Sequence, residues 1–122
     1  MTSRDPIIDT ITARVIIKQK YLDQILAGKK RYELRLRRNN LREIQPDDYL
    51  EFIDQSTFQI KNVWDYNTVY DLPEDIDYTN FSPEFTTREI AIEAALNLYP
   101  IKNQKKYGII VIELNLDKFN LP

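Results

Sequence analysis

Several parts of the chain either alternate apolar and polar side chains or concentrate β-branched ones. Such patterns predict β-strands. The segments with this character are residues 11–18, 31–37, 48–54, 57–72 and 107–116. The long segment 57–72 predicts one strand that continues past a bend, or two strands around residues 65–67.

The segment 31–37 has two different faces. Tyr32, Leu34 and Leu36 share one face of the predicted strand, and we expect this face to pack against the core. The opposite face carries Glu33 and Arg35, which are two residues apart and therefore point the same way.

Two other segments show helical spacing. Residues 20–28 predict a short helix that ends at Gly28, since glycine is favoured just after a helix. Residues 86–99 predict a longer helix, in which Thr86 and Glu89 have capping-box spacing and Pro100 stops the helix. The expected apolar stripe of the longer helix is Ile90, Ala94, Leu96 and Leu98.

The order of these elements predicts a mixed α/β fold that is mainly β. Short connections between the middle strands favour antiparallel pairing, and a small, partly closed barrel with helices at its ends satisfies the pattern. The 122 residues suit one domain. We expect an N-terminal arm over residues 1–10, the domain over residues 11–116 and a C-terminal tail over residues 117–122.

The amino-acid composition excludes several kinds of catalytic and metal-binding site. The chain has no cysteine and no histidine, which excludes disulfides, thiolate nucleophiles, His-ligated metals and Ser-His-Asp triads. We expect no metal and no cofactor. The N-terminal residues carry Asp5 and Asp9 and predict no signal peptide, and the longest apolar run, residues 109–112, is too short to cross a membrane. An intracellular, cytoplasmic protein is therefore expected, with a nuclear location as the alternative.

Charge is unevenly distributed, although the formal net charge is −2. Residues 14–42 contain ten Lys or Arg and two acids, whereas residues 65–93 contain eight acids and one base. A basic face of this kind can attract phosphates. The alternative is that the two regions neutralise each other across the fold.

A four-residue motif lies between the short helix and the strand that follows it: Gly28, Lys30, Glu33 and Arg35. With the following "IQPDDYLEF" and the closing "YGIIVIELNL", this arrangement resembles the ASCH domain family over residues 12–115, whose hallmark is G-x-K-x-x-E-x-R. The family usually has Gly-Asp before the third strand, where this chain has Asp47 and Asp48. The resemblance implies a small PUA-like β-barrel with flanking short helices.

The resemblance also implies a function. PUA-like barrels commonly bind RNA or single modified nucleobases in a cleft, so we expect RNA, a nucleobase or a nucleoside as the partner. The alternative is an enzyme that uses the same cleft, either an amidohydrolase on N4-acetylcytidine or a ribonuclease. A protein-interaction domain, in which the basic and acidic regions meet partner surfaces, is the third hypothesis.

We expect the ligand to contact the motif strand and the aromatic strand. The candidate binding residues are Gly28, Lys29, Lys30, Glu33, Arg35, Arg37, Arg38, Trp64 and Tyr66. Glu33 and Arg35 side by side can accept from an exocyclic amine and donate to a carbonyl or phosphate, whereas a surface ion pair is the structural alternative. The arginines that follow are expected to contact phosphates, and an exposed aromatic to stack on a base or else pack in the core.

If the protein is an enzyme, its candidate catalytic residues are Lys30, Glu33 and Glu89. A lysine among cations can act as a base or nucleophile, but the close Glu33 opposes this. In the amidohydrolase-like members the resemblance implies a Lys, a Thr and a Glu. Lys30 matches the Lys and Glu89 the Glu, whereas Glu33 occupies the Thr position. Glu89 is also explained as the capping partner of Thr86.

Overall fold

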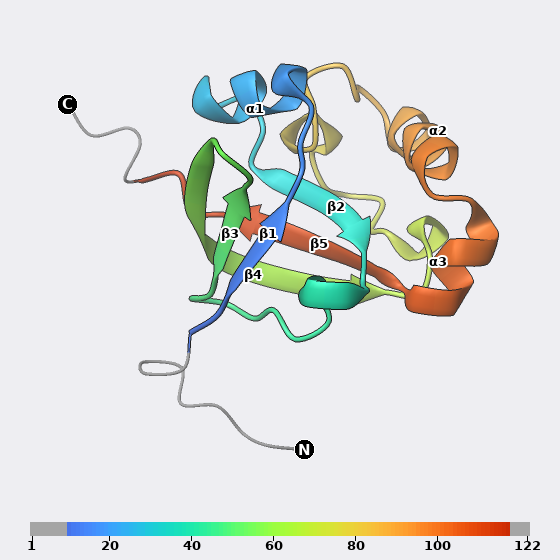
Figure 1. Ribbon diagram of the computed structural model, residues 1–122. Coiled ribbons are helices and arrows are strands. Elements are labelled where there is room, and N and C mark those ends of the chain that lie inside the picture. The colour runs from blue at the N-terminus through green and yellow to red at the C-terminus, as the bar shows by residue number, and fades with distance from the viewer. Residues whose placement is uncertain (1–9, 118–122) are drawn as a thin grey trace.

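In the part of the chain that the structure describes, five strands form one curled sheet with the shape of an open half-barrel (Figure 1). The computed structural model describes residues 10–117. The strands are β1 (Thr12–Val15), β2 (Tyr32–Leu36), β3 (Tyr49–Phe52), β4 (Ser56–Tyr66) and β5 (Ile109–Leu114). Their order across the sheet is β1-β3-β4-β5-β2. Because β1 and β2 are the two edges and do not pair, the barrel stays open between them.

The pairing of the strands is antiparallel except between β1 and β3. The antiparallel pairing predicted for the middle strands is confirmed for β3 and β4. β2 pairs with β5 rather than with β3, so the motif strand lies at an edge. The mainly β, partly closed barrel predicted from the sequence is the observed fold.

Among the described residues, three α-helices flank the sheet. α1 (Gln19–Leu26) lies across the top of the curled sheet in Figure 1, and α2 (Arg88–Leu98) and α3 (Ile101–Tyr107) lie at its right-hand side. The connections add short 3₁₀ helices at Asn39–Leu41, Val69–Asp71 and Tyr78–Asn80.

β5 separates two hydrophobic cores. Ile110 and Ile112 face the first core, which fills the concave side of the sheet and is covered by α1. Ile109 and Val111 face the second core, which α2 and the 3₁₀ segments build on the other side. All six residues of β5 are buried, which explains its continuous apolar run.

The register of β2 determines which core each of its faces meets. Leu34 lies opposite Val111 and packs at the second core, so the apolar face is confirmed as core-facing. Glu33 lies opposite Ile112 and Arg35 opposite Ile110. Residues opposite each other share a face, so Glu33 and Arg35 lie on the side of the first core, at the open edge.

Some local predictions are wrong. Thr87, not Thr86, caps α2, and its hydroxyl accepts from the amide of Ile90 at 3.2 Å. Glu89 therefore stands one place too early for a capping box. The buried residues of α2 are Ala91, Ile92 and Ala95, whereas Ile90 and Leu98 of the predicted stripe are exposed.

The region after α2 also differs from the sequence prediction. Pro100 ends α2, but its carbonyl then accepts the first hydrogen bonds of α3, a helix that the sequence did not predict. Residues 57–66 continue as one strand, β4, which ends at Tyr66. The predicted arm and tail lie, apart from Thr10 and Asp117, outside the described residues. Among residues 10–117, every helix is too short or too polar to span a bilayer.

Candidate functional site

The end of α1 positions the first residue of the charged motif. Gly28 has a φ of 74°. Its amide donates to the carbonyl of Ile25, and the amide of Lys29 donates to the carbonyl of Gln24. These two bonds form a Schellman turn, which needs the left-handed conformation that glycine adopts without strain. The turn leads the chain into β2 with the Lys30 side chain inside the protein, where this residue is 5% exposed.

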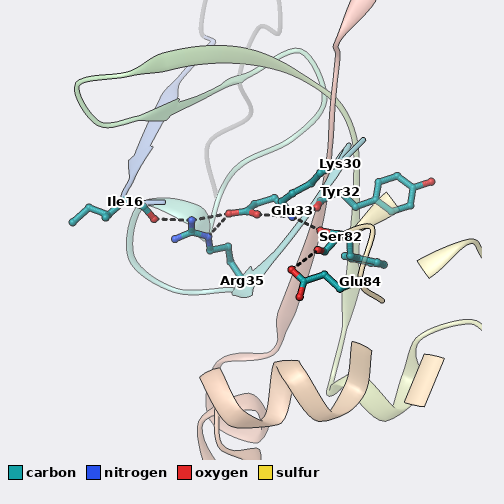
Figure 2. A network of polar contacts seen from close by, with 8 residues as sticks. Ile16, Lys30, Tyr32, Glu33, Arg35, Ser82 and Glu84 are labelled. Atoms are coloured by element: carbon teal, nitrogen blue, oxygen red, sulfur yellow. Dashed lines mark hydrogen bonds and ion pairs between the residues drawn. The ribbon is translucent and has the colours of Figure 1, made fainter. Parts of the chain in front are cut away.

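Lys30, Glu33 and Arg35 form a buried charge cluster (Figure 2). Lys30 Nζ lies 3.0 Å from Glu33 Oε1, and Arg35 Nε and Nη2 lie 2.8 Å and 2.7 Å from Glu33 Oε2. Glu33 is 6% exposed, so the pair is not the surface ion pair of the structural alternative.

The ammonium of Lys30 has no hydrogen left to donate. Besides contacting Glu33, Nζ donates to the backbone carbonyls of Tyr32 at 2.6 Å and Phe81 at 2.8 Å. An ammonium carries three N–H groups, so these three acceptors use all of them. This geometry holds Lys30 as a charged structural group and leaves no lone pair for nucleophilic attack.

Two opposing effects act on the pKa of Glu33. Burial raises the pKa, because the carboxylate loses hydration. The Lys30 ammonium and the Arg35 guanidinium lower it by more, through their charges and hydrogen bonds. The pKa of Glu33 is therefore below its ordinary value of 4.5, and the carboxyl is ionised at neutral pH. The cluster thus carries one net positive charge.

Side chains bridge the open edge between β1 and β2. Arg35 Nη2 donates to the carbonyl of Ile16, just after β1, at 2.7 Å (Figure 2). Asn40 Nδ2 donates to the carbonyl of Arg14 at 2.7 Å. Because side chains rather than a strand ladder join these edges, room remains beside them for a cavity.

A cavity of about 400 Å³ opens at this edge, with the charge cluster at one end. Its volume lies in the range of small-molecule sites, and its mix of apolar walls and few polar groups is typical of them. The lining side chains come from the end of β1, α1, β2, the 72–85 segment and α2: Ile16, Ile17, Lys18, Tyr21, Lys30, Glu33, Leu34, Arg35, Leu72, Phe81, Phe85, Ala91, Ala94, Ala95, Asn97, Leu98 and Tyr99.

Phe81 and Phe85, which lie between β4 and α2, form part of the cavity wall. Lys30 fixes this segment through the carbonyl of Phe81. Lys20 of α1 contacts Glu84 at 2.5 Å. The motif lysine therefore shapes the cavity as well as neutralising Glu33.

Three of the nine candidate binding residues line this cavity, namely Lys30, Glu33 and Arg35. Gly28 and Lys29 are exposed at the end of α1. Trp64 is 39% exposed, and its ring meets that of Tyr32 edge to face at a centroid distance of 5.8 Å. Trp64 is outside the cavity wall.

Arg37, Arg38 and Tyr66 lie elsewhere. Arg37 Nε contacts Asp65 Oδ1 at 3.1 Å, and Arg37 and Tyr66 border a second, polar cavity of about 410 Å³. Arg38 lies over the ring of Tyr107, 5.4 Å from its centroid. All three residues come after β2 in the sequence, and none of them lines the first cavity.

Glu89, the third candidate catalytic residue, is exposed in the first turn of α2 and does not line the cavity. Lys30, Glu33 and Glu89 therefore do not converge on one cavity. Within the described residues, no three acidic side chains are placed to hold a metal ion.

The aromatic wall of the cavity is not predicted by the sequence. Tyr21, Phe81, Phe85 and Tyr99 line the cavity, but they come from three separate segments: α1, the 72–85 segment and the end of α2. Their sequence positions carry no shared motif. The one sequence feature that could have pointed to this wall is Tyr99, next to Pro100. A side chain at the end of a helix can extend past the helix toward a neighbouring cavity.

The fold and the site together define a PUA-like barrel with a cavity beside its open edge. The ASCH domain model matches residues 15–117, and the chain belongs to the ASCH domain family. The resemblance inferred from the motif is confirmed.

Solved structures that are similar to the chain include two proteins of the same fold. The crystal structure of the hypothetical protein PH0355 is 25% identical, with a TM-score of 0.75, and the match covers 88% of this chain and 98% of that one. The solution structure of the protein PF0455 from Pyrococcus furiosus is 26% identical, with a TM-score of 0.68, and the match covers 85% and 96%. No curated protein matches the chain.

Proposed function

We propose that this ASCH domain binds a nucleobase or nucleoside, free or as an unpaired residue of RNA, in the cavity beside the open edge. The observation that supports the proposal is the cavity itself. Its aromatic and aliphatic walls suit the two faces of a planar heterocycle, and its charged end suits a polar edge.

Phosphate contacts have less support than base contacts. Besides Lys30 and Arg35, which contact Glu33, three further cations of the basic segment are paired with acids: Arg14 with Glu51, Lys20 with Glu84 and Arg37 with Asp65. Glu84 and Asp65 belong to the acidic region, so the pairs of Lys20 and Arg37 neutralise the two charged regions in part. Lys18, at the cavity, is the cation best placed to meet a phosphate attached to the bound nucleoside.

Binding is better supported than turnover. The amidohydrolase and ribonuclease alternatives need a free base or nucleophile, whereas the three hydrogens of Lys30 are engaged and Glu33 contacts two cations. Glu89 is outside the cavity. We therefore propose a binding domain.

A thermal-shift screen of plain and modified nucleosides and short RNAs tests the proposal. A ligand at 100 times its Kd stabilises the fold by about 2.7 kcal/mol, which raises Tm by roughly 10 °C for a domain of this size. The variant Ala94→Trp fills the cavity and should abolish the shift. Glu93→Trp adds the same ring on an exposed face of α2 and should retain it. Equal shifts in both variants would rule out this cavity as the site.

A further inference from the structure

The polar end of the cavity has unused hydrogen-bond donors, and these indicate which edge of a base it selects. Arg35 carries five N–H groups. Nε contacts Glu33, and Nη2 contacts Glu33 and the carbonyl of Ile16. Nη1 makes no hydrogen bond to the described residues and, unlike Nη1 of Arg37, is not closed off from solvent. Two N–H donors of Arg35 are thus available at the cavity.

The carboxylate beside them is already occupied. Lys30 contacts one oxygen of Glu33, and Arg35 contacts the other through two nitrogens. Glu33 therefore mainly holds the two cations in place. The sequence-based hypothesis that Glu33 accepts a hydrogen bond from an exocyclic amine has little support from this geometry.

Tyr99 adds a hydroxyl that can either donate or accept a hydrogen bond. Its ring is half-buried at the cavity, and its hydroxyl makes no hydrogen bond within residues 10–117. Burial is the main cause of a raised pKa of Tyr99, so the hydroxyl is neutral at pH 7 and can donate or accept. Tyr99 lines the same cavity as Arg35 and Glu33 of the charge cluster.

Resting on the proposed function, we infer that the cavity selects bases with a keto edge, in which a carbonyl oxygen lies beside a ring N–H. The carbonyl accepts from Arg35 Nη1, and the hydroxyl of Tyr99 meets the neighbouring ring nitrogen. An amino group in place of the carbonyl would turn its own hydrogens toward a guanidinium, leaving donors on both sides without acceptors. The net positive charge of the cluster acts in the same direction.

Matched nucleoside pairs test this inference by calorimetric titration. Uridine and cytidine, and likewise inosine and adenosine, share a sugar and differ at the base edge. We expect the keto member of each pair to bind at least about tenfold tighter, since a matched bidentate contact discriminates by about 1–3 kcal/mol. The RNAs U6 and C6 extend the comparison to bases within a chain.

Two variants assign the selectivity to particular groups. Tyr99→Phe keeps the ring and removes the hydroxyl, and Arg35→Lys keeps the charge and removes Nη1. Each should reduce the keto preference to about threefold or less while the fold, followed by circular dichroism, is retained. If either variant unfolds, the other still decides the assignment. A preference that persists unchanged in the folded variants overturns it.

The remaining outcomes separate this inference from the proposed function. Equal binding of keto and amino nucleosides, abolished in both cases by Ala94→Trp, overturns the selectivity but leaves the cavity as the binding site. Tighter binding of the amino members also overturns it. Failure of every nucleoside and both RNAs to bind overturns the proposed function, and the selectivity with it.

Discussion

At the scale of single residues, Lys30 connects the charge cluster to the cavity wall. Its ammonium group partly neutralises the charge of the Glu33 carboxylate and donates to two backbone carbonyls. Both Lys30 and Glu33 are buried. Removing one partner of a buried ion pair leaves an uncompensated charge and unpaired acceptors, which is costly even when the intact pair contributes little.

We therefore predict that Lys30→Met lowers the free energy of unfolding by about 3–5 kcal/mol. The measurement is urea denaturation at pH 7. The control is Arg14→Ala, which removes one half of the exposed pair with Glu51 and should cost about 1 kcal/mol or less. A Lys30→Met variant as stable as Arg14→Ala would show that the buried contacts are not formed in solution.

The lowered pKa of Glu33 makes the stability depend on pH. Because the folded state binds the Glu33 proton more weakly than the unfolded chain does, this carboxylate stabilises the fold at pH values above 4.5. That contribution is lost as the pH falls from 4.5 through the folded-state pKa. Wild type should therefore lose more stability between pH 6 and pH 3 than Glu33→Gln does.

Denaturation curves at several pH values measure this difference. Asp77 and Glu84 also have lowered pKa values, mainly through hydrogen bonds to Thr79 and Lys20, but both are present in wild type and variant. The difference between the two proteins therefore reports on Glu33. Parallel pH profiles would contradict the ionised, paired carboxylate.

At the scale of elements, the start of α2 offers a sharp test, because two threonines are adjacent. The hydroxyl of Thr87 accepts from the amide of Ile90, whereas Thr86 precedes the cap. We predict that Thr87→Ala lowers the unfolding free energy by about 1 kcal/mol, the usual contribution of a capping side chain. Thr86→Ala should change it by less than half as much. The reverse order in urea denaturation would restore the cap predicted from the sequence.

The shift of the cap from Thr86 to Thr87 shows that a sequence pattern does not fix the exact residue at which a helix begins. Thr86 and Thr87 have the same chemistry, and the tertiary position of the following helix decides which one is the cap. Pro100 reads as a stop signal because it cannot continue α2, but the same residue begins α3. By contrast, Gly28 was predicted correctly, since the Schellman turn requires a conformation that few other residues adopt.

β2, the motif strand, likewise has features that a local pattern predicts and others that only tertiary packing decides. Alternation correctly assigned Leu34 to the core-facing side and placed Glu33 with Arg35. It could not show that the charged face is enclosed, because enclosure depends on β1 and the 81–85 segment, which are distant in sequence. The aromatic wall of the cavity is assembled by the same long-range packing, so no local sequence pattern predicts it.

At the scale of the whole molecule, the basic and acidic regions meet. Arg37, in the basic segment, contacts Asp65, the first residue of the acidic one, at 3.1 Å. A cation held by a carboxylate releases no counterions when a phosphate approaches unless that contact breaks first. The charge segregation seen in the sequence therefore overstates the number of cations that are free to contact a phosphate.

Asp65→Asn should free the Nε of Arg37, while Nη2 still donates to the carbonyl of Ile44 at 3.2 Å, and so expose this effect. If Arg37 then contacts one phosphate of a single-stranded RNA, the slope of log K against log salt becomes steeper by about 0.7. Binding of free nucleosides in the cavity should stay unchanged, because Asp65 is not part of its wall. Fluorescence anisotropy of a labelled short RNA at several salt concentrations measures the slope.

The matched control is Glu89→Gln, which removes the same charge from an exposed position that has no ion pair with the described residues. Its effect measures the change in net charge alone. A slope that steepens equally in both variants would mean that Arg37 gains no phosphate contact when released. A slope that steepens in Asp65→Asn and not in Glu89→Gln would show that the neighbouring acid, rather than the overall charge, limits how the basic segment engages RNA.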